Sequence, residues 1–565
     1  MKKLFSLLLA VMMIVTLFAG CAGEPATTPS GDETPSSSNN EGSSSNQGAV
    51  TPGDDSETPM YMYWQQSIGT DTWIENPMCG ALSLLPNMIF DQLSTIDTTT
   101  NTRYWKIAEK IEQSEDLKTL TVTVRDGIKW HDGERLTVDD VVFSFYAAAC
   151  IPSSNHASFW EGLVGGYEVQ QGEAETFEGL SVEGNVITLT FKQPQPTGIN
   201  DLGNTQIFPK HCFTEGIRWA EFNSQPYWSN PVGTGAYKIS EAKYPDYCKL
   251  VRNDNYFGEK AGIKNVTFVA YGDSNAASAA LISGDLDLGN RQIVKDKTAA
   301  LSIQSQNGNM EIIDVAGYYY RRFAFRTERD DGTGKEILLN PEVRLAINLL
   351  IDEEDIASVY GDAAQPIHVL FSPTDPAYPT HLTREWSDVE EAKRLLNKNG
   401  WDYEDVLTIA YYVDDPTTHT MMQYIVQSLE QAGVQAELMY IKESDYGTTP
   451  KNFDMLYAGG NAAADYQGIQ YLGLTSTQNT WIGDVNRRKD RYDALYNLYD
   501  TSVGEARVQY AQELMELNFE DNYFIPLFVL NNVVVYNKNN IYVPNNVFNN
   551  EGTSEYKWHE WKMLH

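Results

Sequence analysis

Residues 406–440, VLTIAYYVDDPTTHTMMQYIVQSLEQAGVQAELMY, decide the fold class of this chain. The apolar run 406–413 predicts a buried strand, the segment 418–432 predicts a helix, and 434–440 predicts a second strand. A strand, a helix and a strand in this order form a right-handed crossover, which makes the two strands parallel neighbours in a sheet covered by helices. We therefore expect an α/β fold whose ligand lies near the carboxyl ends of the strands.

Capping signals predict two helices before this unit. Asn340 and Pro341 suit the cap and the first residue of one helix. Ser387 and Glu390 suit a capping box for a second helix, which we expect to end near Gly400. The region before the crossover unit is therefore helical.

The chain on either side of this region carries similar local signals. Alternating residues from Leu120 predict a strand that turns back at 125–127, and Thr137 suits the cap of a helix over 138–148. The C-terminal part predicts helices over 488–501 and 505–519, then strands over 524–530 and 533–536. Helices and strands thus alternate along most of the chain.

The N-terminus has the pattern of an export signal. Lys2 and Lys3 precede an apolar run over 4–20, which is short for a membrane-spanning helix, and Cys21 follows the small pair 19–20. The stretch FAGC resembles the lipobox of a bacterial lipoprotein, which implies that Cys21 becomes the lipidated first residue of the mature chain. The competing interpretation is an ordinary cleaved signal with an incidental cysteine.

Residues 22–59 favour the lipid anchor. They contain no aromatic residue, no Lys or Arg, and Val50 as the only large aliphatic residue, so they cannot bury enough surface to fold. As a flexible coil, this segment spans roughly 34 Å root-mean-square. We expect a tether on the outer face of the cell membrane, and its composition fits a bacterium without an outer membrane.

The formal net charge of -36 limits the partners of the chain. Nucleic acid is excluded as a partner, because phosphate binding needs clustered Lys and Arg. A surface of this charge repels anionic lipid, so membrane attachment depends on Cys21. The acidic balance by itself does not identify a ligand.

Cysteine usage leaves two alternatives. Four cysteines lie beyond the lipobox, and they could form two disulfides in three pairings or remain buried thiols: Cys79, Cys150, Cys212 and Cys248. None forms a CxxC motif or has a histidine at zinc spacing, so we expect no metal site and no cofactor.

Successive motifs resemble the extracellular solute-binding proteins, family 5, which are peptide receptors of ABC importers. They are RDGIKWHDGERLTVDDVVFSF (125–145), IFPKHCF (207–213), NPVGTGAYKI (230–239), LVRNDNYFG (250–258), ALISGDLDLG (280–289), NPEVRLAINLLIDEEDI (340–356), EEAKRLLNKNGW (390–401), NFDMLYAGG (452–460) and FIPLFV (524–529). They occur in order over nearly the whole chain after the tether.

The resemblance implies a two-lobed fold of the periplasmic-binding-protein type II, cluster C, with a hinged ligand cleft. Lobe I would comprise 60–272 and 505–565, with an inserted subdomain over about 100–205, and lobe II would comprise 273–504. The lobes would follow the signal, 1–21, and the tether, 22–59. We expect the protein to be a monomer.

The resemblance also implies a ligand residue in the triplet 464–466. Peptide-binding relatives carry an Asp there that pairs with the peptide α-amine, which makes Asp465 the leading ligand residue, with Tyr466 and Asn461 beside it. A solvated loop acid is the alternative. The segment 459–463 departs from the family's Gly-Trp, and Tyr457 stands where relatives often carry Arg. The chain therefore lacks an evident cation for a peptide carboxylate.

Other candidate ligand residues follow from the same resemblance. Strand alternation sends Tyr318 and Tyr320 to one face and Tyr319 and Arg321 to the other, so only one pair can line the cleft. The remaining candidates are Trp160, with core packing as its alternative, His419, with a surface position as its alternative, and the loop residues Gly80 and Leu82, whose backbone would bind an extended peptide.

The favoured function is a lipid-anchored receptor that delivers oligopeptides to an ABC permease. The alternative keeps the scaffold and binds an oligosaccharide or another solute, since Trp and Tyr stack well on sugar rings. A surface hydrolase or adhesin is a remote third hypothesis, because the chain contains no HExxH and no GxSxG motif. We therefore expect no enzymatic activity.

Overall fold

The structure is a computed structural model that describes a large part of the chain. The described residues are 56–64, 76–79, 84–97, 102–152, 154–290, 293–294, 297–373, 377–383, 388–413, 416–442, 445, 448–461, 489–522, 524–544, 547–548 and 556–565, with backbone only at 79, 97, 316, 318, 362, 461, 489 and 490. Cys21, residues 22–55 of the predicted tether, Gly80, Leu82, Asp465 and Tyr466 lie outside them.

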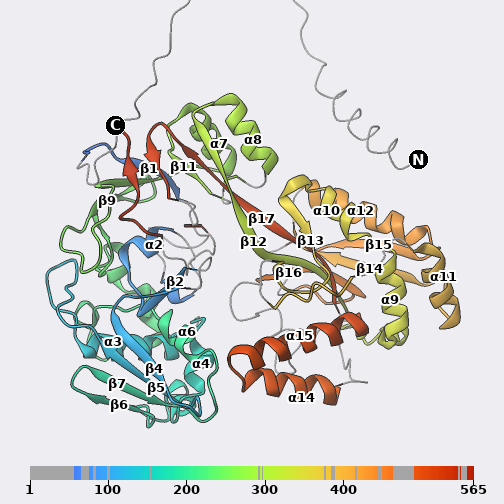
Figure 1. The fold of residues 1–565 in the computed structure, drawn as a ribbon, viewed down its shortest axis with the longest axis horizontal. Coiled ribbons are helices and arrows are strands. Elements are labelled where there is room, and N and C mark those ends of the chain that lie inside the picture. Colours follow the sequence, from blue (N-terminus) through green and yellow to red (C-terminus); the bar gives the residue numbers. More distant parts are fainter. Residues whose placement is uncertain are drawn as a thin grey trace, which may run out of the picture. The chain divides into compact units, whose positions relative to one another are not determined.

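The largest sheet contains strands from both ends of the chain (Figure 1). Its order is β15-β14-β16-β12-β17-β11-β1-β10-β9-β8, and β13 pairs with β17 beside this path. The strands are β1 (Met60–Trp64), β8 (Tyr237–Lys243), β9 (Tyr247–Arg252), β10 (Asn265–Ala270), β11 (Leu288–Gly289), β12 (Met310–Phe325), β13 (Ala364–Pro366), β14 (Val406–Tyr411), β15 (Gln435–Tyr440), β16 (Met455–Asn461) and β17 (Phe524–Asn537).

The crossover unit has the expected geometry. Strand β14 pairs in parallel with both β15 and β16, and α12 (Pro416–Glu430) connects β14 to β15. The buried residues of α12 face this sheet. The parallel arrangement and the α/β class predicted from 406–440 are confirmed, with strand and helix ends shifted by about two residues.

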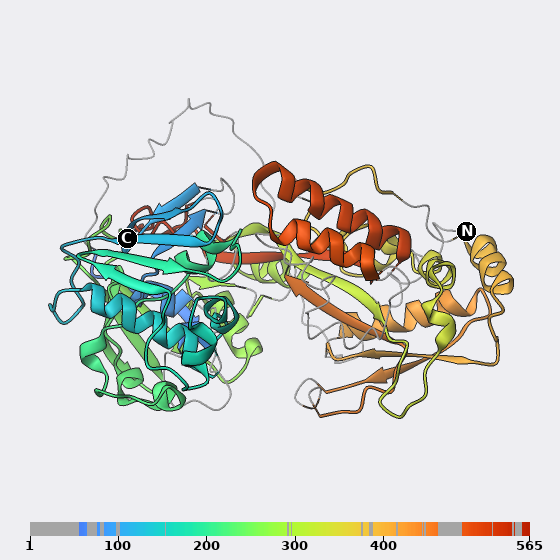
Figure 2. The same cartoon turned by 90° about the horizontal axis from the view of Figure 1, so that it is seen from below.

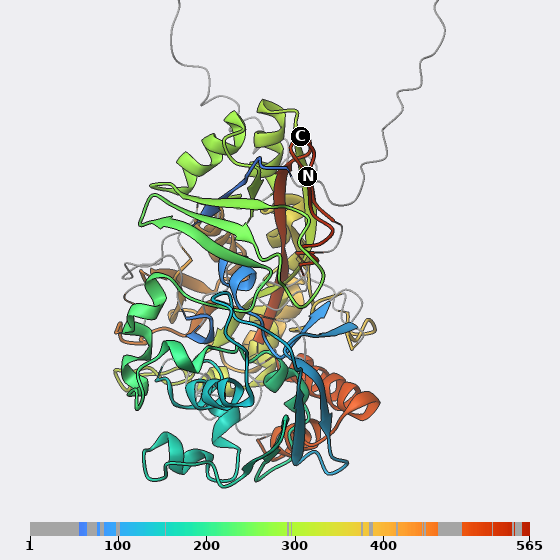
Figure 3. The same ribbon diagram turned by 90° about the vertical axis from the view of Figure 1, so that its left-hand side faces the viewer.

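Strands β12 and β17 are long, antiparallel and adjacent (Figures 1 and 3). The prediction of two separate strands over 524–530 and 533–536 is wrong, because β17 is continuous through Asn531 and Asn532. Instead of a turn, the pairing has a register shift between Val315 and Tyr319 of β12. A bulge of this kind absorbs extra residues without ending the strand.

Helices cover the two faces of β12. One apolar cluster joins Phe323 and Phe325 to α9 (Pro341–Leu349), α10 (Glu353–Ser358), α11 (Val389–Lys398) and α12. A second cluster joins Tyr320 and Ala324 to α14 (Lys489–Asp500) and α15 (Gly504–Asp521), which lie side by side in Figure 2. Within 320–325 of β12, the odd-numbered Phe323 and Phe325 therefore face α9 to α12, and the even-numbered Tyr320 and Ala324 face α14 and α15.

Helix caps follow the sequence signals with one exception. Thr137 and Asp140 form a capping box at α3 (Val138–Cys150), and Asn340 Oδ1 accepts from Glu342 N–H at α9. The cap predicted at Ser387 is wrong. Asp388 caps α11 instead, since its carboxylate accepts from Glu391 N–H at 3.0 Å.

The N-terminal half contains smaller sheets beside the large one. Strands β4, β5, β7 and β6 form an antiparallel sheet within 108–190, inside the range expected for the inserted subdomain. The remaining elements are β2 (Ser94–Asp97), β3 (Thr102–Trp105), β4 (Ala108–Gln113), β5 (Thr119–Val124), β6 (Leu180–Glu183), β7 (Val186–Thr190), β18 (Ile541–Tyr542), β19 (Lys562–Met563), α2 (Leu84–Ile89), α4 (Ala157–Glu161), α5 (Gly166–Gln170), α6 (Gly198–Gly203), α7 (Ser274–Ser283), α8 (Lys297–Gln306), η1 (Pro77–Cys79), η2 (Lys210–Cys212), η3 (Trp219–Ser224), η4 (Pro226–Ser229), η5 (Glu336–Leu339) and η6 (Gly361–Ala363).

The cysteines with described side chains are thiols. Cys150 and Cys212 are half-buried, Cys248 is buried, and all three are free. The alternative with two disulfides is therefore wrong, and burial raises the pKa of each of these thiols. Among the described helices, none combines the length and the apolar character that crossing a membrane requires.

Candidate functional site

The candidate site lies where the parallel strands β14, β15 and β16 end, beside β12 (Figure 1). Tyr411 is paired in register with Tyr440 on one side and with Tyr457 on the other. Tyr457 is paired in turn with Phe323 of β12. Residues paired in this way point to the same face, so one aromatic row crosses four strands, at the last residue of β14 and of β15 and two residues after the start of β16.

Arg321 lies next to this row. It is paired with Gly459 in β16 and with Phe528 in β17. Its guanidinium carbon lies 4.9 Å from the ring centroid of Tyr319 and 5.6 Å from that of Tyr457. These distances are those of cation–π contacts.

Gly459 is required for this arrangement. A Cβ atom at this position would lie 2.3 Å from Tyr319 Cε1 and 2.8 Å from Arg321 Nη1. Any larger residue would therefore displace the two side chains that fill the space above the glycine. Of the predicted ligand residues, the structure brings Tyr319 and Arg321 together here.

Four tyrosines surround Arg321, and we call them the tyrosine cluster: Tyr319, Tyr360, Tyr412 and Tyr457. Burial acts to lower the pKa of Arg321, while the four phenols act to raise it, and the net shift is upward. Burial also raises the pKa of Tyr412. At neutral pH Arg321 therefore keeps its charge, and Tyr412 keeps its proton.

His419 lies at the other end of the aromatic row. Its Nδ1 lies 3.0 Å from the hydroxyl of Tyr411, and its ring packs against Tyr411 and Tyr440. The hydroxyl group of Tyr360 lies 2.8 Å from Thr418 Oγ1, next to His419 on α12. His419 is thus attached to the row rather than standing alone on the surface.

Two predicted ligand residues belong to the core. Trp160 is 0% exposed and packs against Phe145, Phe159 and Phe177, so the structure supports core packing over an aromatic wall. Tyr320 is also 0% exposed, beneath α14 and α15. Of the two faces that strand alternation left open, the one with Tyr320 is covered by helices.

Sequence reasoning did not select Tyr411, Tyr440, Tyr360 and Tyr412 as site residues. Their proximity to Arg321 or to one another depends on the order β15-β14-β16-β12, which no local pattern gives. A pattern of tyrosines at strand ends was the available signal. The side chains of Tyr318 and Asn461 are not described, and Asp465, Tyr466, Gly80 and Leu82 stay predictions.

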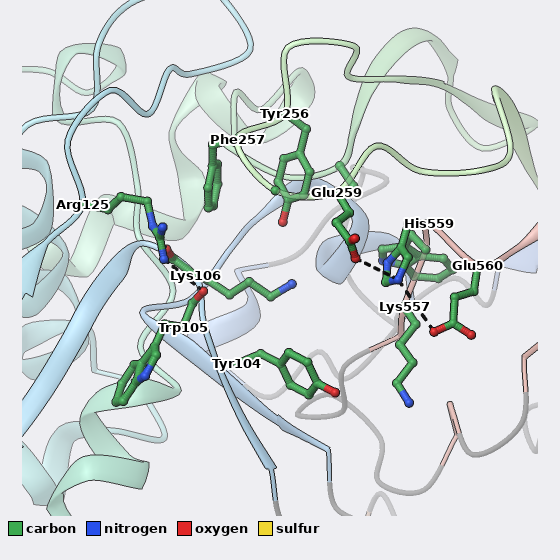
Figure 4. Close-up of a pocket in the computed structure, with 13 residues that line it drawn as sticks. Tyr104, Trp105, Lys106, Arg125, Tyr256, Phe257, Glu259, Lys557, His559 and Glu560 are labelled. Atoms are coloured by element: carbon green, nitrogen blue, oxygen red, sulfur yellow. Dashed lines mark hydrogen bonds and ion pairs between the residues drawn. The ribbon is translucent and has the colours of Figure 1, made fainter. Parts of the chain in front are cut away.

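A surface pocket of about 370 Å³ lies elsewhere, among β3, Arg125, the 256–259 loop and the C-terminal residues 557–560 (Figure 4). Arg125 donates to the carbonyl groups of residues 105 and 106. His559 lies 2.9 Å from Glu259 and 3.7 Å from Glu560. None of the predicted ligand residues lines this pocket, and these charged groups already have partners.

Within the described residues, one group of side chains has metal-ligating atoms close together: Asp132, His211 and Cys212, all within 4.8 Å. His211 Nε2 lies 2.9 Å from Asp132 Oδ2, which makes an ion pair or a hydrogen bond. Burial, with the charges of Asp132 and Asp140, raises the pKa of Cys212 to about 11. In the absence of a metal ion the thiol is therefore protonated.

Comparison with known proteins identifies the family. Residues 104–481 match the model of the Bacterial extracellular solute-binding proteins, family 5 Middle. The oligopeptide-binding protein AppA of Bacillus subtilis is 26% identical, over 71% of this chain and 67% of its own length.

Solved structures show the same fold. The ABC transporter substrate-binding protein CtaP of Listeria monocytogenes has a TM-score of 0.74 at 20% identity, over 91% of this chain and 100% of its own. NikZ of Campylobacter jejuni, solved with Ni(L-His), has a TM-score of 0.68 at 20% identity, over 89% and 99% of the two chains. The α/β fold with its large sheet is the two-lobed architecture of this family, as the sequence motifs implied. The chain belongs to the bacterial extracellular solute-binding proteins, family 5.

Proposed function

We propose that this protein is an exported receptor that captures oligopeptides and delivers them to the permease of an ABC transporter. The match over residues 104–481 carries the proposal, because that family consists of solute receptors rather than enzymes. The similarity to an oligopeptide-binding protein supports peptides as the solute class. Stacked aromatic side chains and a cation at the carboxyl ends of β14 and β16 suit a ligand with apolar and charged groups.

Ligand-induced stabilisation tests the solute class. The mature protein is heated with pooled peptides of two to nine residues or with pooled neutral oligosaccharides, and its Tm is measured. A ligand present at 100 times its Kd stabilises the folded state by about 2.7 kcal/mol, which raises Tm by about 2–3 °C in a protein of this size. We expect a rise with peptides only. A rise with oligosaccharides only would replace peptide by sugar, and no rise with either pool would contradict both.

Asp465 is proposed to pair with the α-amine of the peptide. Its replacement by Ala should weaken peptides with a free amine by about 10- to 100-fold, because a charge-assisted hydrogen bond is lost. N-acetylated versions of the same peptides should bind the wild type and the variant equally. The exposed Asp126, which pairs with Arg135, offers a control replacement, Asp126→Ala, with the same change in net charge. Equal losses for both peptide forms would exclude this role.

Closure of two lobes around the ligand is part of the proposal, with lobe I over 60–272 and 505–565 and lobe II over 273–504. The large sheet continues from β12 through β17 to β11 and β1, so strand pairing alone does not mark these limits. Converting a mostly open population to a mostly closed one takes about 5.5 kcal/mol of differential binding. Small-angle scattering with and without the bound peptide should give a smaller radius of gyration in its presence.

Membrane attachment through a lipid on Cys21 is the remaining part of the proposal. The order of charged, apolar and small residues before Cys21 supports it, together with the polar segment 22–59. Replacing Cys21 with Ser should leave the protein in the soluble fraction of cells, whereas the unchanged chain sediments with membranes. Sedimentation of both forms would contradict the anchor.

A further inference from the structure

Arg321 is a largely buried cation without a charged partner among the described residues. Its Nε atom is buried and makes no hydrogen bond, and no ion pair or hydrogen bond of its guanidinium group is found within the described residues. Its contacts are the rings of Tyr319 and Tyr457. Burial of an unpaired charge is unfavourable, so such a group needs a specific reason to be there.

Three other arginines in or near β12 have hydrogen-bond or ion-pair partners within the protein. Arg326 pairs with Asp330 at 2.7 Å, and Arg329 binds Asp454 through two hydrogen bonds of 3.0 and 2.6 Å. Arg344 donates to the backbone carbonyl group of Asp521. The protein therefore supplies acceptors for these three guanidinium groups, whereas none is found for Arg321 among the described residues.

The surroundings of Arg321 suit a carboxylate. Its guanidinium group presents parallel N–H donors whose geometry matches the two oxygens of a carboxylate. The hydroxyl groups of the tyrosine cluster are of a kind that can donate further hydrogen bonds to a carboxylate. A single cation matches a ligand group with one negative charge. The position at the carboxyl ends of β14 and β16 is where ligands of α/β proteins bind.

We propose that Arg321 binds a carboxylate of the transported solute, and that in an oligopeptide this is the C-terminal carboxylate. This inference rests on the proposed function and makes it more specific. The preferred ligands are then peptides with a free C-terminus, and neutral oligosaccharides and C-terminally amidated peptides are poor ligands. Gly459 provides the space in which Arg321 and Tyr319 lie together.

Titration calorimetry with a matched peptide pair tests this assignment. The peptide that raises Tm most is synthesised with a C-terminal acid and with a C-terminal amide, and both are titrated into the wild type and three variants. Arg321→Met removes the charge and keeps the volume, Arg321→Lys keeps the charge and loses the paired donors, and Arg394→Met is the control. Arg394 pairs with Glu391 on the exposed side of α11, and its replacement changes the net charge equally.

The wild type and Arg394→Met should bind the acid about 10- to 100-fold more tightly than the amide, as expected for loss of one charge-assisted pair. Arg321→Met should bind the two forms equally, at the affinity of the amide in the wild type, and Arg321→Lys should recover part of the preference. Equal binding of acid and amide by the wild type would overturn the assignment. A preference for the acid that survives in Arg321→Met would overturn it too.

Failure of the assignment can be separated from failure of the proposed function. If no peptide binds, the same proteins are heated with amino acids and dicarboxylates, and stabilisation of the wild type but not of Arg321→Met would support the carboxylate site. Stabilisation by neutral solutes alone would overturn it.

Without any ligand, Arg321→Met should unfold at an equal or higher urea concentration than the wild type, because an unpaired charge is removed. A lower midpoint would assign Arg321 a structural role instead.

Discussion

Arg321 and Arg329 lie eight residues apart and illustrate two uses of a buried cation. Arg329 makes a bidentate pair with Asp454, whose side chain is fully buried and also accepts from the backbone N–H of Thr408. Arg321 lies among tyrosines and has no acid beside it within the described residues. The first arrangement is complete within the protein, and the second is complete only when a ligand supplies the anion.

The presence or absence of a charged partner indicates whether a buried cation serves stability or ligand binding. A paired charge makes its replacement costly, because the partner is left alone in the interior. Replacing an unpaired charge that binds a ligand should change the free energy of unfolding little and should weaken ligand binding strongly. The comparison can therefore be tested by measuring both stability and affinity for each residue.

The largest effect on stability is expected at the paired site. Asp454→Ala removes the carboxylate that accepts from Arg329 and from Thr408 N–H, so the guanidinium loses its anion and keeps only the hydrogen bond to Thr408 Oγ1. We expect a loss of about 3–5 kcal/mol in the free energy of unfolding, measured by urea denaturation. Arg321→Met should lose none. Similar losses in both variants would remove the distinction between the two sites.

Other buried ionisable groups in this protein are neutral in the folded state. For such groups the free energy of unfolding depends on pH. Burial lowers the pKa of His131 and of His156 from 6.5 to about 4. Below pH 6.5 the unfolded chain therefore binds more protons than the folded one, so stability falls as the pH drops from about 6.5 to about 4. Each histidine accounts for up to about 3 kcal/mol, and above pH 6.5 neither contributes a slope.

Urea denaturation between pH 4 and pH 8 measures this slope. His156→Gln should reduce the difference between its stability at pH 4.5 and at pH 7, compared with the wild type. His381→Gln is a suitable control, because His381 is exposed. A pH profile of His156→Gln that parallels the wild type would contradict the neutral, buried state of His156.

Gly459 tests whether the tyrosine cluster tolerates displacement. A methyl group at this position overlaps Tyr319 and Arg321, so Gly459→Ala should cost about 1–3 kcal/mol in stability, as overpacking does. It should also weaken peptide binding, because the guanidinium group moves. Gly308→Ala is the matched control, since a Cβ there meets no atom within 4 Å. Unchanged affinity in Gly459→Ala would mean that the ligand does not contact Arg321.

Much of the fold could be predicted because its signals are local. Thr137 with Asp140, and Asn340 with Pro341, predict helix starts from neighbouring residues alone. The parallel pairing of β14 with β15 follows from the sequence of the unit that joins them. The cap at Asp388 was misplaced by one residue, since Ser and Asp both suit that position.

Features that depend on distant residues could not be predicted. Nothing around residue 531 indicates that β17 continues, because its length is set by pairing with β12. The helices α14 and α15, which begin more than 160 residues after Tyr320, cover it. Their position decides which face of β12 is open to a ligand, and no local pattern predicts it. The contact of Arg321 with Tyr457 likewise depends on β16 lying next to β12.

The smallest expected effect concerns how far the site extends along the aromatic row. His419→Ala removes the contact of Nδ1 with the Tyr411 hydroxyl and should cost about 1 kcal/mol in stability, the usual net value of one hydrogen bond. If the ligand contacts only the region of Arg321, affinity should change less than twofold, because Tyr457 and Tyr411 separate the two residues. A loss of affinity comparable to that of Arg321→Met would instead extend the binding site across β14 to α12. Calorimetry with the same acid and amide peptides distinguishes the two, since only a change at Arg321 should abolish the preference for the acid.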